Sequence, residues 1–249
     1  MEEKEILGEG YGFDPSLVLY LPLWKLDATS GGKITSQDAY GYLCTVTGAV
    51  WRPTGRYFDG ADDEITMGDT STFAWLHGAA DTTSFQSTIS LWISLPTPEP
   101  DALYALVSTN LAALGSRGFM IFFDDRSAGP YSRRLRYQMS NGTASVIDFA
   151  SNDNAYPNDS DFHLLTFTYD QALADTNATI YVDATLKKVG NKAAVTPSAS
   201  ASVYALHIGM AGDGSFDAAA TIGEIWVYNR VLTSLEIQHN YLTTKWRYV

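Results

Sequence analysis

The sequence predicts a single all-β domain, a two-sheet antiparallel β-sandwich of jelly-roll type with one short C-terminal helix. Short runs rich in β-branched and aromatic residues recur along the chain, and clusters of Gly, Pro, Asn, Asp and Ser separate them. Several of these runs alternate apolar and polar residues, as strands with one buried face do. With 249 residues, 45% of them hydrophobic, the chain can bury a sizeable core as one sandwich.

The first element expected is an N-terminal tether over residues 1–16, followed by the sandwich domain over residues 17–249. The tether holds five acidic residues, one lysine and three glycines, a composition that becomes ordered only against a partner. The first strand is expected over residues 17–24, with Pro22 at an edge or strand end because proline lacks an amide donor. Further strands are expected at residues 42–47, 56–59, 63–67, 86–95, 103–108, 118–123, 134–139, 144–149, 162–169, 178–183, 186–189, 203–209 and 222–229.

Strict alternation assigns the faces of these strands. In the run 86–95, Leu91 and Trp92 are expected on opposite faces of the sheet. In the last strand, the same rule places Ile222, Glu224 and Trp226 together on one face.

The helix is expected over residues 234–242. Thr233 and Glu236 have the spacing of a capping box, in which each side chain binds the backbone amide of the other residue. The tail at residues 245–249 is basic and aromatic, and is expected to pack on its own domain or on a neighbouring subunit. The helix side chains expected to pack on the sandwich are Leu235, Ile237 and Tyr241.

The charge of the chain excludes some classes of partner. Sixteen Lys and Arg against 28 Asp and Glu give a net charge of −12, whereas nucleic-acid binding needs a basic surface. No run approaches the roughly 18 apolar residues of a membrane-spanning helix. Charged residues make up only 18% of the chain, which is typical of β proteins of the extracellular space or of a virion surface, and we expect such a location. No secretory signal is visible, so either it was removed or the protein needs none, as in a protein built into a virus particle. The single cysteine, Cys44, excludes an intrachain disulfide and is expected to be buried.

Several stretches resemble, in order, the laminin-G-like or concanavalin-A-like lectin–glucanase jelly-roll family. Residues 57–65 resemble its FDGxDDxI segment, 85–93 its FTISLWI strand, 162–170 its WHHLTFTYD strand, 180–183 its IYVDG hairpin and 222–233 its closing IDEVRIYNRALS. The resemblance covers about residues 17–242 and implies the sandwich fold. It does not define a function, since this fold carries lectins, adhesion domains, glycosidases and virion proteins.

The resemblance also implies a structural calcium site. In the family, the FDGxDD loop and an acidic residue of the last strand lie near each other and often hold Ca²⁺, which prefers several oxygen ligands. The alternative is that Asp59 and Asp62 make turn hydrogen bonds while the other carboxylates are solvated. This sequence departs from the family at Gly223, where an acidic residue is usual, and at Ala184, where a glycine is usual. The expected metal ligands are Asp59, Asp62, Asp63 and Glu224.

No catalytic residues are predicted, and we expect the protein not to be an enzyme. A glycosidase needs two carboxylates facing each other across a cleft, and glucanases with this fold place theirs in an ExDxE pattern that is absent here. Asp124 and Asp125 are adjacent, so on a strand they would face opposite ways. A pair of carboxylates distant in sequence remains an alternative. HExxH, GxSxG and phosphate-binding loops are also absent, and the four histidines are expected to be structural or solvent-facing.

Aromatic residues in loops suggest ligand contacts, because aromatic rings pack against the CH faces of sugars. The residues expected in such contacts are Trp51, Trp75, Tyr131 and Tyr156, with ordinary packing as the alternative for each.

The sequence leaves three hypotheses for the function. The first is a non-catalytic glycan-binding or adhesion module on a cell or virus-particle surface, with a glycan or protein partner. The second is a virion structural protein, such as a capsid decoration, turret or fibre-head protein, that contacts homo-oligomer or capsid subunits through residues 1–16 and the C-terminal tail. A glycosidase is the remote third.

Overall fold

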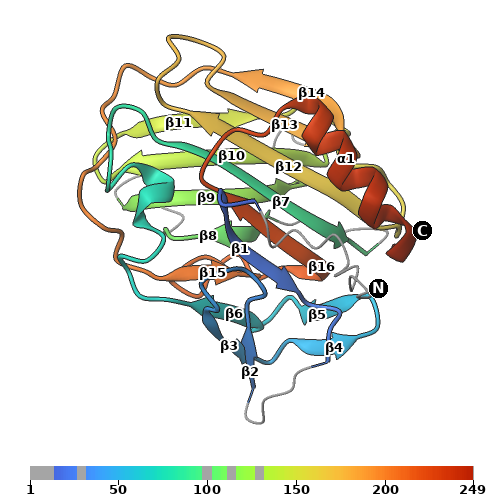
Figure 1. The fold of residues 1–249 in the computed structure, drawn as a ribbon. Helices are drawn as coiled ribbons and strands as arrows, with labels where there is room; N and C mark the ends of the chain where they lie inside the picture. Colours follow the sequence, from blue (N-terminus) through green and yellow to red (C-terminus); the bar gives the residue numbers. More distant parts are fainter. Residues whose placement is uncertain (1–13, 27–31, 97–102, 111–115, 127–131, 249) are drawn as a thin grey trace, which may run out of the picture.

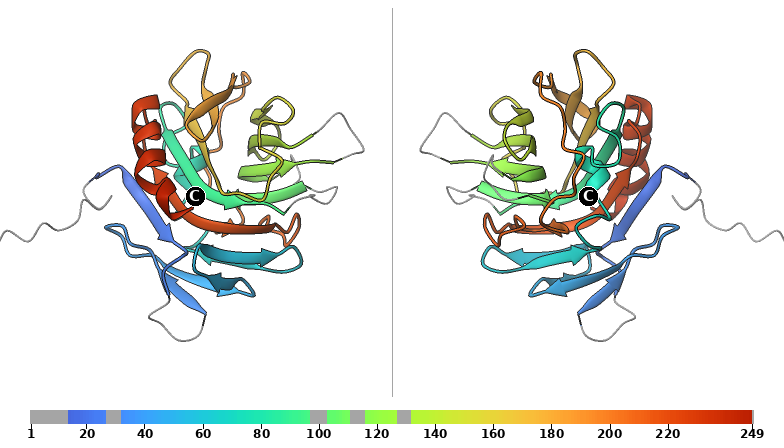
Figure 2. Two further views of the ribbon diagram at one scale, coloured as in Figure 1. Left: turned by 90° about the vertical axis from the view of Figure 1, so that its right-hand side faces the viewer. Right: turned by 90° about the vertical axis from the view of Figure 1, so that its left-hand side faces the viewer.

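The computed structural model describes residues 14–26, 32–96, 103–110, 116–126 and 132–248, and it folds as two eight-stranded antiparallel sheets. Figure 1 shows the arrangement, and Figure 2 shows the two sheets as layers with the helix on the outer side of one of them. In sheet A, the strand order is β14 (Thr185–Gly190), β13 (Ala178–Val182), β12 (His163–Asp170), β7 (Gln86–Ser94), β16 (Ala219–Tyr228), β5 (Gly55–Asp59) and β4 (Val50–Arg52), and β1 (Leu17–Pro22) pairs with β16. In sheet B, the order is β11 (Ser145–Ala150), β10 (Arg134–Asn141), β9 (Arg117–Asp124), β8 (Leu103–Ser108), β15 (Leu206–Ile208), β6 (Glu64–Met67), β3 (Leu43–Thr47) and β2 (Lys33–Thr35).

This architecture confirms the predicted fold class, and most predicted strands agree with the structure to within one or two residues. The strand expected at 203–209 is shorter, and Pro22 ends β1 as expected. The sequence analysis missed β2 and β4, each of three residues, and the short 3-10 helices η2 (Ala74–His77) and η3 (Lys245–Arg247). No helix within the described ranges is long and apolar enough to cross a membrane.

The main core lies between the two sheets, where the inward side chains of both meet. Leu91 faces this core and Trp92 faces outward, as alternation predicts. The prediction for Ile222 was wrong, because the register of β16 against β7 shifts between Ile222 and Ile225. This β-bulge lets both isoleucines face inward and leaves Glu224 on the outer side with Trp226. Cys44 is buried in the same core, as expected.

The helix α1 (Ser234–Thr244) covers the outer face of sheet A and extends two residues beyond the predicted end. Its capping box between Thr233 and Glu236 is present, as predicted. Ile237 is buried, but Leu235 is 74% exposed, so the prediction that Leu235 packs on the sandwich was wrong. Trp92 anchors the far end, since its Nε1 donates to Thr244 Oγ1 at 2.8 Å.

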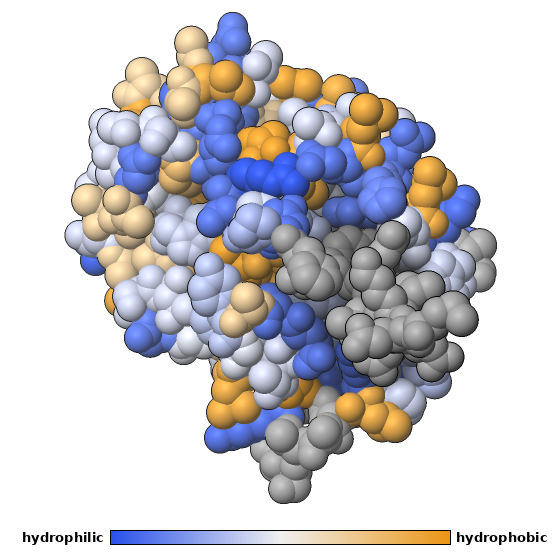
Figure 3. All heavy atoms as spheres, viewed as in Figure 1, coloured by the Kyte–Doolittle hydropathy of each residue, from blue (hydrophilic) through white to orange (hydrophobic). Residues whose placement is uncertain are grey.

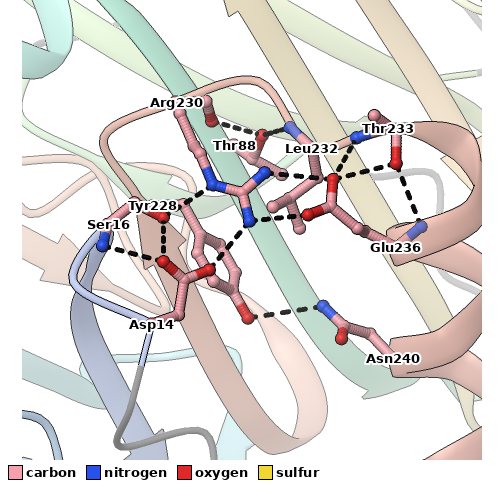
Figure 4. A network of polar contacts seen from close by, with 9 residues as sticks. All are labelled: Asp14, Ser16, Thr88, Tyr228, Arg230, Leu232, Thr233, Glu236 and Asn240. Atoms are coloured by element: carbon pink, nitrogen blue, oxygen red, sulfur yellow. Dashed lines mark hydrogen bonds and ion pairs between the residues drawn. The ribbon is translucent and has the colours of Figure 1, made fainter.

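A polar network ties the start of β1 to the start of α1 (Figure 4). The Arg230 guanidinium donates to the carboxylates of Asp14 and Glu236, at 2.8 and 2.7 Å from Nη2, and its Nε donates to Ser16 Oγ at 2.8 Å. Glu236 also accepts the Thr233 amide at 2.7 Å. The last residues of the predicted tether, Asp14 to Ser16, are therefore bound to the domain, and residues 1–13 lie outside the described part.

The β13–β14 hairpin keeps its tight two-residue turn although alanine replaces the family's glycine. Asp183 and Ala184 have φ of 49° and 59°, the left-handed conformation that a type I′ turn requires. The Asp183 carboxylate accepts the Leu164 amide at 3.0 Å and so supports this conformation. A non-glycine residue in this region costs roughly 1–2 kcal/mol, which the surrounding contacts offset.

Candidate functional site

Three aspartates converge in the turn between β5 and β6. One carboxylate oxygen from each of Asp59, Asp62 and Asp63 lies within 4.8 Å of the others. Gly60, with φ of 83°, makes the tight turn, and Asp59 Oδ1 accepts the Ala61 amide at 2.9 Å. Asp63 Oδ2 accepts the Asp59 amide at 2.8 Å. The local part of the predicted metal cluster therefore forms, together with the turn hydrogen bond that the alternative reading expected of Asp59.

Asp63 is the buried member of this cluster, with 5% of its surface exposed. Its carboxylate packs against Gly48, where any β-carbon would collide with it. Burial raises the pKa of Asp63, the hydrogen bond from the Asp59 amide opposes this, and the charges of Asp59 and Asp62 raise it further. A cation beside these oxygens would relieve the repulsion.

A fourth carboxylate, which the sequence analysis missed, comes from the loop between β15 and β16. Burial and the charges of Asp62, Asp59 and Asp213 raise the pKa of Asp217. Its Oδ1 is buried and has no hydrogen-bond partner within the part of the chain that the structure describes. The pairing of Ala219 with Asp59 in the sheet brings this loop beside the β5–β6 turn. This long-range pairing, and not local spacing, identifies Asp217.

Glu224 does not belong to this cluster, which corrects the predicted ligand set. It lies five residues beyond Ala219 on β16, about 16 Å in an extended strand. Its carboxylate is fully buried on the outer side of sheet A and accepts hydrogen bonds at 2.9 Å from Tyr20 and 2.6 Å from Arg247. Burial raises the pKa of Glu224, and the Arg247 charge opposes that shift.

Tryptophans surround this buried ion pair at the surface. The Arg247 guanidinium lies 4.1 Å from the ring centroid of Trp24 and 4.9 Å from that of Trp246. Trp246 is 69% exposed. Trp51 joins the group because its Nε1 donates to the Trp24 carbonyl at 2.9 Å. We refer to Trp24, Trp51 and Trp246 as the tryptophan cluster.

Gly223 is the point at which the elements of this cluster meet. The Leu23 amide donates to the Gly223 carbonyl at 2.9 Å, which brings the end of β1 here. The backbone of Gly55, in the β4–β5 hairpin, lies against Gly223 on the other side. A β-carbon on Gly223 would collide with the ring of Tyr248, so glycine lets the C-terminal tail lie on the sheet. This packing gives a structural reason for the departure from the family at Gly223.

The structure places the residues predicted to contact a ligand in different environments. Trp51 lies in the tryptophan cluster, whereas Trp75, on η2, packs partly buried against the main core. Tyr156 is fully buried and its hydroxyl donates to the Ile93 carbonyl at 3.0 Å, so its prediction as a loop contact was wrong. Tyr131 lies outside the described residues. Of the two packings expected for the C-terminal tail, the structure shows the one on its own domain, through Tyr248 and Arg247.

One histidine, at the start of β12, is held between two carboxylates. His163 Nδ1 lies 2.7 Å from Asp183 Oδ2 and its Nε2 lies 2.8 Å from Asp159 Oδ1. Burial lowers the pKa of His163, but the hydrogen bonds and charges of the two aspartates outweigh it and the net shift is upward. With both ring nitrogens engaged, this histidine has a structural role, as expected.

Residues 59–238 match the family model of the concanavalin A-like lectin/glucanases superfamily. This match covers more than half of the chain, and the protein belongs to that superfamily. Among curated protein sequences, none matches this chain.

Solved structures of low sequence identity share the fold. The receptor-binding domain of botulinum neurotoxin D superposes with a TM-score of 0.65 at 10% identity, covering 92% of this chain and 52% of that one. The receptor-binding domain of the botulinum neurotoxin C/D mosaic serotype gives 0.64 at 11% identity, with 92% and 51% covered. A Trypanosoma rangeli sialidase in complex with sialic acid gives 0.60 at 17% identity, with 94% and 34% covered. The chain thus spans about half of the neurotoxin domains and a third of the sialidase.

Proposed function

We propose that this protein is a non-catalytic glycan-binding or adhesion module displayed on a cell or virus-particle surface. The observation that carries the proposal is the tryptophan cluster: the rings of Trp24 and Trp246 both lie against Arg247, and Trp246 is 69% exposed. Trp51 is hydrogen-bonded to the backbone of Trp24. Aromatic faces bind the CH faces of pyranose rings, and an exposed tryptophan gains more than other residues from being covered. Elsewhere, apolar side chains are scattered among polar ones on the face shown in Figure 3.

The ion pair beneath the cluster supports this role, because it fixes the ring positions before any ligand arrives. Arg247 is held by Glu224 on the sheet and stands between the rings of Trp24 and Trp246. A preorganised aromatic site loses less side-chain entropy when it binds.

We further propose that the acidic turn holds a structural Ca²⁺. The oxygens of Asp59, Asp62 and Asp63 would hold it, with Asp217 in place of the predicted Glu224. The fit rests on hard oxygen ligands and on the Asp217 oxygen that has no partner among the described residues. It also rests on the pKa values of Asp63 and Asp217, which burial raises and the charges of neighbouring aspartates raise further. The ion would supply charge compensation that joins the β5–β6 and β15–β16 loops. Calcium at 100 times its Kd would stabilise the fold by about 2.7 kcal/mol, measured as a shift in thermal unfolding that Asp217→Asn reduces.

We propose no catalysis. Of the adjacent pair considered as catalytic carboxylates, Asp124 forms a two-point ion pair with Arg126. Asp125 instead accepts the Arg133 amide at 2.9 Å. Both carboxylates have structural partners, which supports a binding role over a hydrolytic one.

A glycan array run with calcium and again with EDTA tests the proposal. The intact protein should bind a defined subset of glycans, and Trp246→Ala should lose at least about tenfold in affinity, or 1.4 kcal/mol. Leu235→Ala, an equally exposed change on the adjoining helix, is the matched control and should bind normally. Binding by Trp246→Ala at the level of the intact protein would remove the cluster from the site, and an array without any binding would refute glycan recognition. Loss of binding in EDTA would join the calcium site to the function.

The second candidate function is a structural subunit of a particle surface. The outward side of α1 favours it, since Leu235 and Leu242 are 74% and 50% exposed and follow one helix face toward Trp246. Light scattering of the purified protein separates the two functions. A discrete oligomer that Leu242→Glu dissolves would support assembly through this face.

A further inference from the structure

Three cations beside the tryptophan cluster, Lys25, Arg52 and Lys245, have aromatic rings as neighbours and form no ion pair with a carboxylate of the described residues. Lys25 Nζ lies 5.6 Å from the Trp24 ring centroid, Arg52 Cζ lies 3.9 Å from that of Tyr57, and Lys245 Nζ lies 5.6 Å from that of Tyr241. We propose that this face binds an anionic saccharide, one whose rings carry carboxylate or sulfate groups. The inference rests on the proposed glycan-binding function and names its ligand class.

The immediate neighbours of these three cations are the first step. On sheet B, Arg136 forms a two-point ion pair with Asp148 at 2.8 and 2.7 Å. Arg230, near the start of α1, binds two carboxylates. Lys25, Arg52 and Lys245 form no ion pair with any carboxylate of the described residues, as is also true of Lys187 and Lys188 on β14. Unlike these two lysines, each of the three lies close to an aromatic ring.

The positions of these cations relative to the tryptophans are the second step. Lys25 follows Trp24, Arg52 follows Trp51, and Lys245 precedes Trp246 in the sequence. Each of the three segments that meet at Gly223 therefore contributes one tryptophan and one cation with no carboxylate partner. Arg52 lies with Tyr57 on the outer side of sheet A, because the next residue, Phe58, faces the core. Trp51, which pairs with Arg56, points to the other side of β4, so Arg52 accompanies the rings of Trp24 and Trp246.

The local charge is the third step. Arg247 is neutralised by the buried Glu224, so its charge is not available to a ligand. Lys25 and Arg52 are both exposed, and Lys25 Nζ donates to Gln37 Oε1 at 3.5 Å. Asp38, on the β1 side, accepts the amides of Tyr20, Tyr40 and Gly41 and keeps its negative charge. Lys25, Arg52 and Lys245 outnumber it, so these four side chains together carry a net positive charge in a protein whose net charge is −12.

These features together select the ligand class. Tryptophan rings provide the stacking surface for sugar rings, and the cations provide charge-assisted hydrogen bonds to anionic substituents. A neutral sugar would leave the cations unused, and an anion without sugar rings would leave the tryptophans unused. The negative charge of the remaining surface would disfavour anionic ligands anywhere else on the molecule.

Calorimetry with three matched oligosaccharides tests the inference: a neutral parent, its carboxylated form and its sulfated form. We expect at least one anionic form to bind about tenfold more tightly than the neutral parent, since hydrogen bonds to charged groups contribute about 1.5–3 kcal/mol. This advantage should fall as salt is raised. The comparison of the two anionic forms identifies which group the site takes.

Two double variants test which cations bind the anionic groups of the saccharide. Lys25→Ala with Arg52→Ala should bring the affinity for the anionic form down to that for the neutral parent and leave neutral binding unchanged. Lys187→Ala with Lys188→Ala, on the edge strand β14, removes the same charge and should change nothing. Equal binding of the neutral and anionic forms, or equal loss in both variant pairs, would overturn the inference while leaving glycan binding intact. Absence of binding by all three saccharides would refute the proposed function and the inference together.

Discussion

Arg247→Met should destabilise the protein strongly at neutral pH, because it leaves Glu224 buried without its counter-charge. Glu224 is 0% exposed and Arg247 Nη1 lies 2.6 Å from its Oε1. Removing one partner of a buried ion pair typically costs about 3–5 kcal/mol. Methionine keeps an unbranched apolar chain against the ring of Trp24, so the loss of stability measures the removed charge more than lost packing.

The pH dependence of this loss tests its cause. Burial already raises the pKa of Glu224, and without Arg247 that pKa should rise further. A folded state that binds the proton more tightly than the unfolded state gains stability as the pH falls toward the unfolded value. The deficit of Arg247→Met measured by urea unfolding should therefore be smaller at about pH 5 than at about pH 7.5.

A double variant completes the test. Glu224→Gln combined with Arg247→Met removes both charges while the amide oxygen still accepts from Tyr20, so it should cost less than Arg247→Met alone. A neutral-pH deficit below about 0.5 kcal/mol, as for an exposed pair, would refute the reasoning. A deficit that grows as the pH falls would also refute it.

Three further predictions concern the tail, the histidine and the helix cap. Gly223→Ala should displace the Tyr248 ring and cost about 1–3 kcal/mol in urea unfolding, and an unchanged midpoint would contradict the close packing. The pKa of His163 is raised in the folded state, so its contribution to stability is fully present below the unfolded value of 6.5 and is lost as the pH rises through the folded value. In His163→Asn, this dependence of the free energy of unfolding on pH should disappear. Glu236→Ala should cost about 1 kcal/mol at neutral pH by removing the cap and the partner of Arg230. The pKa of Glu236 is lowered to about 2, so the difference between this variant and the intact protein should disappear as the pH falls from about 4.5 toward 2.

Sequence alternation predicted the fold because most strands bury one face only. The assignment of Leu91 and Trp92 to opposite faces was right since β7 is regular there. It failed at Ile222, where a bulge adds a residue to one strand of a pair. A bulge depends on the partner strand, which a single run of sequence does not contain. The short strands β2 and β4 were missed because three residues are too few to show alternation.

The site was predicted only where its residues are neighbours in the sequence. Asp59, Asp62 and Asp63 share one turn, so their convergence follows from a local glycine. Asp217 lies in a loop that sheet pairing across the molecule brings beside this turn.

Of the tryptophan cluster, only Trp51 was among the predicted ligand contacts, because the three tryptophans come from distant segments. Trp24 had the pattern of a buried strand residue, and Trp246 belonged to a tail that offered two ways of packing. Only the meeting of the segments at Gly223 joins them.

The central position of β16 has a consequence for how the protein is made. This strand pairs with β1, β5 and β7, yet it is the last strand of the chain to leave the ribosome. Pairing of Leu17 with Tyr228 must therefore wait until nearly the whole domain has been synthesised. A nascent chain that ends before residue 219 would present three strands without their partner, and at that stage it would need protection from aggregation.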